Sequence, residues 1–172
     1  MRVDAQCEQI ELILSDVDGV LTDGSVIYTN EGIEIKRFHI RDGMGIRIWQ
    51  RAGYRFGLLT ARSSNVVKVR AAEIGVEIVR QGFDDKLAET KRIAESLELD
   101  LSQIAYIGDD LVDLQVVNAV GLGIAVNDAV AEVQAAADYV TQADGGHGAV
   151  RETIEMVLKA KHRWETVISR FT

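Results

Sequence analysis

An apolar run that ends in two closely spaced acids is the feature that most constrains this chain. The run from Ile10 to Leu14 is mostly apolar and is followed at once by Asp16 and Asp18. Such a run predicts a buried strand, so its two acids lie at the strand's carboxyl end, where open α/β sheets bind ligands. Two neighbouring carboxylates repel each other unless a cation lies between them. The pattern therefore predicts a site for a hard metal ion such as Mg²⁺, which prefers oxygen ligands.

Strand and helix patterns alternate along most of the sequence. The strand patterns lie near residues 10–15, 54–59, 76–80, 104–107, 121–125 and 138–141, and the helical patterns near 43–52, 64–74, 85–97, 111–119 and 149–161. This order predicts an α/β fold, a doubly wound parallel sheet of the Rossmann-like kind with helices on both faces. Gly53, Gly75 and Gly121 follow predicted helices and are expected to cap them.

One segment, at about residues 25–38, interrupts this alternation. Two β-rich runs, Val26–Tyr28 and Ile33–Lys36, flank an Asn-Glu-Gly turn, which predicts a β-hairpin. It follows the acidic strand end directly, so we expect it to project over the site. An exposed two-stranded hairpin is marginal alone, which favours packing against another subunit in a homo-oligomer. The alternative is a solvated hairpin with no partner.

Length and composition limit the classes of protein to which the chain can belong. With 172 residues, 47% hydrophobic and 27% charged, it is expected to be one domain spanning 1–172, with a tail at about 162–172. The net charge of -8 argues against nucleic acid or an anionic membrane as partner. A lone Cys7, with neither a leader nor a membrane-spanning stretch in the sequence, favours a cytoplasmic protein.

Two further strand or helix boundaries carry groups that suit an anion. Thr60 ends the strand pattern at 54–59, and Ser63 and Ser64 open the following helix, whose positive end attracts anions. Lys86 stands in the first turn of a helix, where its charge opposes the helix dipole. Each residue alone has an ordinary alternative: Thr60 as a helix cap and Lys86 as a solvated side chain.

A second buried strand pattern also ends in acids. The run at 104–107 is followed by Asp109 and Asp110, with Asp113 one turn further on. A helix cap explains one such acid but not three beside Asp16 and Asp18. Acids for a divalent cation, together with a hydroxyl and an ammonium for phosphoryl oxygens, form the set that phosphoryl transfer requires.

Four motifs, taken in chain order, resemble those of the haloacid dehalogenase superfamily, and the resemblance covers nearly the whole chain. The matching motifs are Asp16-Val-Asp18-Gly-Val-Leu-Thr, Thr60, Lys86 and Gly108-Asp109-Asp110. The resemblance implies that Asp16 is a nucleophile that forms an aspartyl-phosphate and that Asp18 is the general acid and base. It also implies that Thr60 and Lys86 hold the transferring phosphoryl group.

The same resemblance implies a magnesium site. Mg²⁺ would be bound by the carboxylates of Asp16 and Asp109 and by the backbone carbonyl of Asp18. Asp110 and Asp113 would orient these ligands from outside the direct coordination sphere.

Within the superfamily the chain is most similar to small sugar-acid phosphatases that carry a β-hairpin in place of a cap domain. That similarity implies a tetramer in which neighbouring subunits complete one another's sites, and an anionic sugar-acid phosphate as substrate. We expect the phosphate ester of an eight-carbon 3-deoxy sugar acid, used in lipopolysaccharide biosynthesis. The implied substrate contacts are Asp18, His39, Ile40, Arg41, Asp42, Gly43, Arg47, Arg62, Arg70 and Lys86. Arginine side chains suit a substrate carboxylate, although Arg47 and Arg70 would also be ordinary as solvated helix residues.

The sequence also allows other interpretations of the function. The substrate could be a nine-carbon sialic-type sugar acid phosphate, but Arg62 stands where some relatives of that kind carry an acid. The chain could also be a non-catalytic oligomerisation module or a phosphate-accepting signalling receiver; the intact acid, threonine and lysine set opposes the first, and Asp18 with the hairpin opposes the second. The glycines at 145–148 are expected to start the last helix rather than bind phosphate. The tail carries Trp164, Val167, Ile168 and Phe171 at helical spacing, which favours packing against the core or a subunit.

Overall fold

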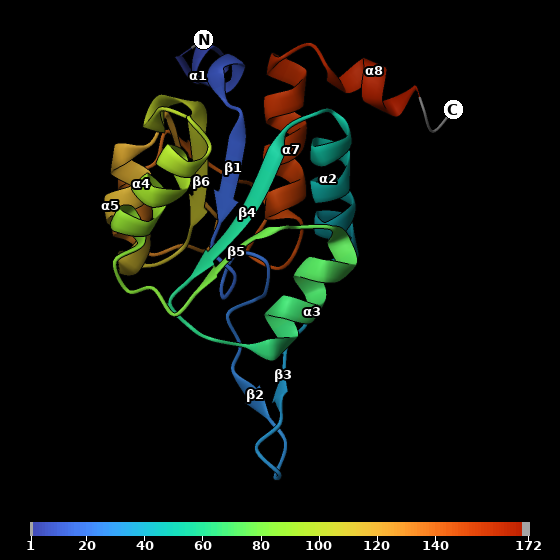
Figure 1. Cartoon of the computed structure of the whole chain (residues 1–172), viewed down its shortest axis with the longest axis vertical. Helices are drawn as coiled ribbons and strands as arrows, with labels where there is room; N and C mark the ends of the chain where they lie inside the picture. The colour runs from blue at the N-terminus through green and yellow to red at the C-terminus, as the bar shows by residue number, and fades with distance from the viewer. Residues whose placement is uncertain (1, 170–172) are drawn as a thin grey trace.

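The computed structural model describes residues 2–169, and a six-stranded sheet lies at its centre (Figure 1). Its order is β5-β4-β1-β6-β7-β8, and every neighbouring pair is parallel. The strands are β1 Leu12–Ser15, β4 Arg55–Thr60, β5 Ile78–Gln81, β6 Ile104–Gly108, β7 Leu122–Ala125 and β8 Tyr139–Val140. The expected α/β fold with a doubly wound parallel sheet is confirmed.

Helices cover both faces of this sheet. Helices α2, α3 and α7 lie on one side in Figure 1, and α4 and α5 lie on the other, with α6 packed on α5. The α-helices are α1 Arg2–Gln9, α2 Ile40–Arg51, α3 Asn65–Ile74, α4 Lys86–Ser96, α5 Leu114–Ala119, α6 Ala131–Ala136, α7 Ala149–Ala160 and α8 Trp164–Ile168, and the 3₁₀ turns are η1 Leu101–Gln103 and η2 Leu111–Asp113. None of the described helices is long and apolar enough to cross a membrane.

The two central strands, β1 and β6, are buried along their whole length. Every residue of Leu12–Ser15 and of Ile104–Gly108 is buried, because helices cover both faces of a parallel sheet and leave no wet side. This is why both sequences read as continuous apolar runs rather than as an alternation of apolar and polar residues. In chain order the sheet runs 3-2-1-4-5-6, so β1 and β6 flank the point where the strand order reverses.

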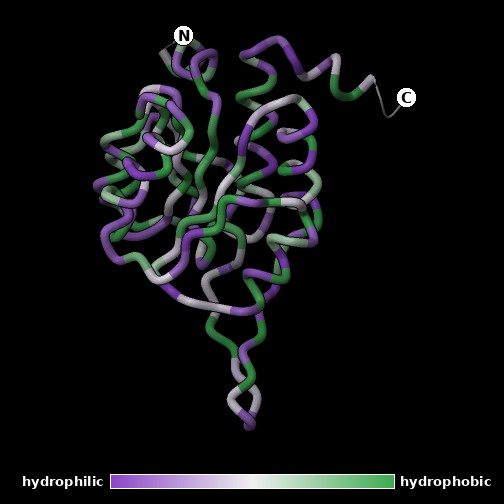
Figure 2. Tube along the Cα trace, in the orientation of Figure 1, coloured by the Kyte–Doolittle hydropathy of each residue, from purple (hydrophilic) through white to green (hydrophobic). Residues whose placement is uncertain are grey.

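The expected hairpin projects from the end of the molecule toward which the strands of the sheet point (Figure 1). Strands β2 Ile27–Tyr28 and β3 Glu34–Ile35 pair antiparallel, with Ile27 opposite Ile35. Gly32 completes the turn at a left-handed φ of 78° and donates its amide to the carbonyl of Thr29 at 3.0 Å. Figure 2 shows apolar segments along this projection as well as in the sheet. Val26, Ile27, Tyr28, Ile33 and Ile35 are all exposed there.

The structure also contains elements that periodicity did not indicate. Helix α1 is mostly polar and is held by the buried Cys7 and by its packing on α7. Helix α6 has only six residues, of which Val133 alone is buried. In both cases tertiary packing stabilises a helix whose apolar stripe is too narrow to be seen in the sequence.

The three glycines expected to cap helices do not behave alike. Gly53 and Gly75 have left-handed φ angles of 99° and 73° just after α2 and α3, which confirms that expectation. The expectation for Gly121 is wrong, because α5 ends at Ala119 and Gly121 is not left-handed. A Cβ at Gly121 would overlap the backbone carbonyl of Ser102. Glycine is therefore required there for close backbone approach and not for a cap.

The structure also tests the predictions for the glycines at 145–148 and for the C-terminal tail. The glycines at 145–148 do lead into α7, with Gly148 at its N-cap. The tail forms α8, in which Val167 is buried and the Trp164 ring lies under the Arg151 guanidinium at 5.5 Å. Phe171 lies outside the described residues.

Candidate active site

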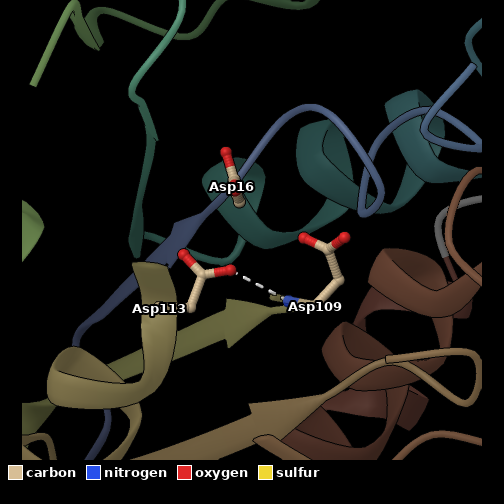
Figure 3. Close-up of side chains that lie close together, drawn as sticks. All are labelled: Asp16, Asp109 and Asp113. Carbon is tan, nitrogen blue, oxygen red and sulfur yellow. Dashed lines mark hydrogen bonds between the residues drawn. The ribbon is translucent and has the colours of Figure 1, made fainter. Parts of the chain in front are cut away.

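Three carboxylates meet where β1 and β6 end (Figure 3). Asp16 follows β1, Asp109 follows β6, and Asp113 closes the 3₁₀ turn η2. Each contributes an oxygen that lies within 4.8 Å of the other two. The topology thus brings together acids that are more than ninety residues apart in the chain. The acids that follow β1 and the acids that follow β6 therefore lie at one site.

A buried lysine lies between two of these acids. The Lys86 ammonium donates to Asp16 Oδ2 at 2.6 Å and to Asp113 Oδ1 at 2.6 Å. Its side chain is only 1% exposed, so the lysine is part of the site rather than of the solvated surface. The N-cap Asp85 accepts a hydrogen bond from the amide of Ala88 at 2.9 Å and starts α4 at Lys86.

Asp113 is held on both of its oxygens. Its Oδ1 also accepts a hydrogen bond from the Tyr106 hydroxyl at 2.6 Å, and its Oδ2 accepts from the backbone amides of Asp109 and Asp110 at 2.9 and 3.3 Å. A carboxylate bound in this way orients its neighbours and has little capacity left for a ligand. The sequence analysis missed Tyr106, although a tyrosine within an otherwise apolar strand is a signal that its hydroxyl has a buried partner.

The electrostatics of the cluster reflect an excess of negative charge. Burial and then the charge of Asp113 raise the pKa of Asp16 from 3.8 to about 7, even though Lys86 opposes the shift. Burial, then Asp16 and Asp113, raise the pKa of Asp109 from 3.8 to about 8. Burial alone would lower the pKa of Lys86, but the two acids beside it raise that pKa above its ordinary value. One lysine does not balance three carboxylates, of which Asp16 and Asp113 are buried and Asp109 is partly buried.

The residues present fit a divalent cation. Asp109 Oδ1 is buried and has no hydrogen-bond partner among the described residues, which is costly for an acid unless a ligand satisfies it. Gly19, at a φ of 91°, lets the backbone after Asp18 come so close that a Cβ there would overlap the Asp109 carboxylate. An oxygen-only donor set with uncompensated charge is typical of Mg²⁺ sites. Asp110 instead caps the amide of Leu111 at 2.7 Å.

A small hollow adjoins these acids. It has a volume of about 170 Å³ and is lined by the predicted site residues Asp16, Asp18, Thr60, Arg62, Lys86, Asp109 and Asp110, together with Ala61 and Val112. Thr60 is buried at the end of β4, and its hydroxyl oxygen accepts a hydrogen bond from the amide of Arg62 at 3.2 Å. Pockets for whole small-molecule ligands are usually about 300–1,000 Å³, so this hollow suits a phosphoryl group and not an entire sugar acid.

The base of the hairpin also contacts this hollow, through residues that the sequence analysis did not select. Lys36 forms an ion pair with Asp18 and lies 3.3 Å from Glu34. Arg62 Nη2 donates to both Glu34 Oε1 and the Tyr28 hydroxyl at 3.1 Å. Polar residues on an exposed hairpin look solvated in a sequence, because nothing local shows that the strand folds back on the site.

Other predicted substrate contacts lie apart from the hollow. Ile40 is exposed at the start of α2, and His39 and Gly43 lie on either side of its first turn. Asp42 is buried, accepts the amide of Arg151 at 2.8 Å, and has its pKa raised by burial. Arg41 is exposed and lines a separate depression near the start of α7.

The arginines Arg47 and Arg70 lie along α2 and α3. Arg47 is exposed and donates to the carbonyl of Glu73. Arg70 pairs with Glu73 at 2.9 Å, lies 5.7 Å from the centre of the Phe38 ring and packs where a Cβ of Gly43 would be. Within one chain, the structure brings neither arginine to the three acids.

A larger hollow of about 780 Å³ lies against α1 and α7. Glu152, one of the four acids that line it, is already engaged by the Tyr139 hydroxyl and by the amides of Gln142 and Ala143. These bonds hold the loop after β8 and give Glu152 a structural role.

Comparison with known proteins identifies similar hydrolases. A family model for haloacid dehalogenase-like hydrolases matches residues 60–152. The 3-deoxy-D-manno-octulosonate 8-phosphate phosphatase of Escherichia coli K12 is 41% identical over 157 residues, which cover 91% of this chain and 84% of that protein.

Solved structures of similar proteins superpose closely on the chain. The phosphatase of the same name from Moraxella catarrhalis, in complex with magnesium ion, phosphate ion and KDO, has a TM-score of 0.97 at 40% identity and covers 99% of this chain and 98% of its own. The cobalt-bound phosphatase from Haemophilus influenzae has a TM-score of 0.90 at 37% identity and covers 94% of each chain.

Proposed function

The chain belongs to the haloacid dehalogenase-like hydrolases, and we propose that it is a Mg²⁺-dependent phosphatase that converts 3-deoxy-D-manno-octulosonate 8-phosphate into the free sugar acid and phosphate. The observation that carries the proposal is the buried contact of Lys86 with Asp16 beside the unsatisfied Asp109 oxygen. That arrangement supplies a nucleophile, a cation for phosphoryl oxygens and ligands for a metal in one small hollow. We place the reaction in lipopolysaccharide sugar biosynthesis in the cytoplasm.

Asp16 is the nucleophile in this proposal. Its Oδ1 accepts the amide of Val17 at 2.6 Å and its Oδ2 accepts Lys86, so the carboxylate is fixed in orientation. An oxygen of Asp16 attacks phosphorus, the bond from phosphorus to the sugar oxygen breaks, and an aspartyl-phosphate forms. Lys86 and Thr60 hold the phosphoryl oxygens. Bound Mg²⁺, held by Asp16, Asp109 and the carbonyl of Asp18, would neutralise the charge that gathers on those oxygens.

Asp18 moves the proton. In the first step it gives a proton to the sugar oxygen as that oxygen leaves, and in the second it takes a proton from the water that attacks the aspartyl-phosphate. Asp18 lines the hollow beside Asp16, and its side chain is 20% exposed. It can therefore exchange protons with a group bound there.

The remainder of the substrate requires residues that one chain does not bring to the hollow. Arg62 lines it and is suited to a carboxylate. The segment 39–43, Arg47 and Arg70 lie elsewhere on the chain, and we propose that they serve the site of a neighbouring copy in a homotetramer. The exposed apolar residues of the hairpin support that assembly, because monomeric proteins seldom leave such a patch uncovered.

The double variant Ile27→Asp with Ile35→Asp is expected to dissociate the assembly. These side chains face each other across the hairpin and are 43% and 46% exposed, so two added charges oppose burial against another subunit. Light scattering after gel filtration should give the mass of one chain for this variant and a multiple of it for the unmodified chain. Thr166→Asp, exposed on α8 at the opposite end, is the control. An unmodified chain that elutes as a monomer would rule out shared sites.

Mg²⁺ is expected to stabilise the chain more strongly at pH 8 than at pH 6. Without a cation, Asp16 and Asp109 have pKa values of about 7 and 8 when folded, against 3.8 ordinarily. The folded state then binds extra protons, so these two groups contribute stability that is fully present at low pH and is lost as the pH rises through these values. A cation needs the ionised carboxylates and competes with those protons.

Thermal unfolding with and without Mg²⁺ at the two pH values checks this expectation. At a hundredfold excess over its dissociation constant, Mg²⁺ should raise the midpoint at pH 8 by about 5–10 °C. A monovalent salt at equal ionic strength controls for screening. A Mg²⁺ effect of the same size at pH 6 and pH 8 would contradict the assignment of these acids.

The proposed substrate is tested with a panel of sugar-acid phosphates, each assayed for phosphate release with and without Mg²⁺. The eight-carbon ester should be turned over with the highest kcat/KM, and chelation should abolish the reaction. Preference for a nine-carbon sialic-type ester would reassign the substrate. No release from any sugar-acid phosphate would favour the non-catalytic oligomerisation module instead.

A further inference from the structure

The hairpin buries a lysine against the active site. The Lys36 side chain is 2% exposed, although β3, which ends one residue before it, lies on the outside of the molecule. Its ammonium forms an ion pair with Asp18 Oδ1 and lies 3.3 Å from Glu34 Oε1. A charged group that loses its water needs such partners. Lys36 therefore has a defined place and a defined neighbour, the carboxylate assigned to proton transfer.

The contact makes the two oxygens of Asp18 unequal. Oδ1 is taken by Lys36, whereas Oδ2 is buried and has no hydrogen-bond partner among the described residues. The Nε of Arg62 lies 3.9 Å from Oδ2, which is too far for a hydrogen bond. One oxygen is thus anchored, and the other is left for a group bound in the hollow.

Lys36 is itself fixed by the rest of the hairpin base. Glu34 accepts hydrogen bonds from the Ser64 hydroxyl and, at 3.1 Å, from Arg62, so it joins β3 to the loop after β4. The Ser64 hydrogen bond, together with Lys36 and Arg62, holds the pKa of Glu34 below its ordinary value, so this acid stays ionised beside the lysine. The next residue, Arg37, is 70% exposed and pairs with Asp23 at the surface.

We propose that Lys36 is a positioning residue for the reaction, which anchors Oδ1 of Asp18 so that Oδ2 faces the sugar oxygen that leaves and then the attacking water. The inference rests on the proposed phosphatase function and deepens it. In the first step the O–H bond of Asp18 breaks and its proton goes to the leaving oxygen as that oxygen's bond to phosphorus breaks. In the second step the water oxygen bonds to phosphorus, the bond from phosphorus to the Asp16 oxygen breaks, and a proton of that water returns to Asp18. The hairpin then contributes to catalysis within its own subunit, apart from any role in assembly.

Lys36→Met tests this role, with Arg37→Met as the matched control from the adjacent position. The methionine keeps most of the length of the side chain but cannot hold Oδ1. We expect kcat for the sugar-acid phosphate to fall by at least about tenfold with KM changed by less than about threefold. With p-nitrophenyl phosphate, whose leaving group departs without a proton, the loss in the rate of the first step, measured from the burst of p-nitrophenolate, should be less than about threefold. Lys36→Arg should restore most of the lost activity, and Arg37→Met should match the unmodified chain.

A double-variant cycle separates this role from a structural one. In an Asp18→Asn background, Lys36→Met should cause no further loss, because its partner is already inactive. Equal losses in the rate of the first step for both substrates, measured in single turnovers, or additive losses in the double variant, would overturn the inference. If Lys36→Met does not fold, as judged by thermal unfolding, Lys36→Leu gives the same comparison, because leucine also has no donor for Oδ1. Failure of the unmodified chain to hydrolyse any sugar-acid phosphate would instead overturn the proposed function. That assay is carried out before any variant is made.

Discussion

Asp16→Asn should abolish phosphate release, lowering kcat by at least about a thousandfold. An amide cannot replace the carboxylate oxygen that attacks phosphorus, although it has the same shape. The fold should survive the change. Burial and Asp113 raise the pKa of Asp16 to about 7, so at pH 8 the ionised acid opposes folding in the absence of a cation. A neutral side chain removes that cost.

The melting midpoint of Asp16→Asn at pH 8 without Mg²⁺ should therefore equal or exceed that of the unmodified chain. Its further rise on adding Mg²⁺ should shrink, because a ligand has been removed. Asp100→Asn, which changes an exposed acid at the start of η1, is the control for loss of charge. Turnover by Asp16→Asn within about tenfold of the unmodified rate would show that another residue is the nucleophile.

Lys86→Met should lose both activity and stability. Lys86 is the cation shared by Asp16 and Asp113, at 2.6 Å from each. Its loss leaves buried carboxylates without their partner, which typically costs about 3–5 kcal/mol of unfolding free energy. Phosphate release should fall by at least about a hundredfold, because a phosphoryl oxygen loses the ammonium that stabilises its charge.

Urea unfolding at pH 8 without Mg²⁺ measures the stability change. Lys91→Met provides the control, because Lys91 lies on the same helix and is exposed; its unfolding free energy should change by less than about 0.5 kcal/mol. A Lys86→Met variant as stable and as active as the Lys91 control would mean that the lysine contacts in the site carry no energy.

The parallel sheet covered by helices and the acids at its edge could be predicted because both depend on burial. Parallel strands covered on both faces read as apolar runs, and the acids that end β1 and β6 stand out against them. The topology that joins Asp16 to Asp109 follows from the alternation of strands and helices. Helices α1 and α6 could not be predicted, because their stability comes from contacts made after the chain has folded. The sequence predicts a cap at Gly121 because it shows only the position of a glycine. It does not show whether the fold requires a left-handed φ there or the absence of a Cβ.

In the candidate site, too, some residues could be predicted from the sequence and others could not. Asp16, Asp18, Thr60, Lys86 and Asp109 stand at element boundaries, which a sequence reveals. Tyr106 and Lys36 are held by side-chain contacts across the fold, to Asp113 and Asp18. The apolar strand around Tyr106 signals that its hydroxyl has a buried partner but not which one, and nothing in the immediate neighbours of Lys36 indicates its contact.

The predicted substrate arginines illustrate a further limit. Arg62 lies at the hollow, whereas Arg47 and Arg70 lie between α2 and α3. A single chain contains no information on which surfaces another copy would bring to its site, so their role depends on the assembly proposed above.

Trapping the phosphorylated enzyme tests the central claim most directly. The unmodified chain would be mixed with Mg²⁺ and radiolabelled sugar-acid phosphate, quenched in acid during turnover, digested and mapped. The label should lie on the peptide that contains Asp16, should be released by hydroxylamine as an acyl phosphate, and should be absent from Asp16→Asn. Label on any other residue, or an enzyme that remains unlabelled throughout turnover, would contradict the account.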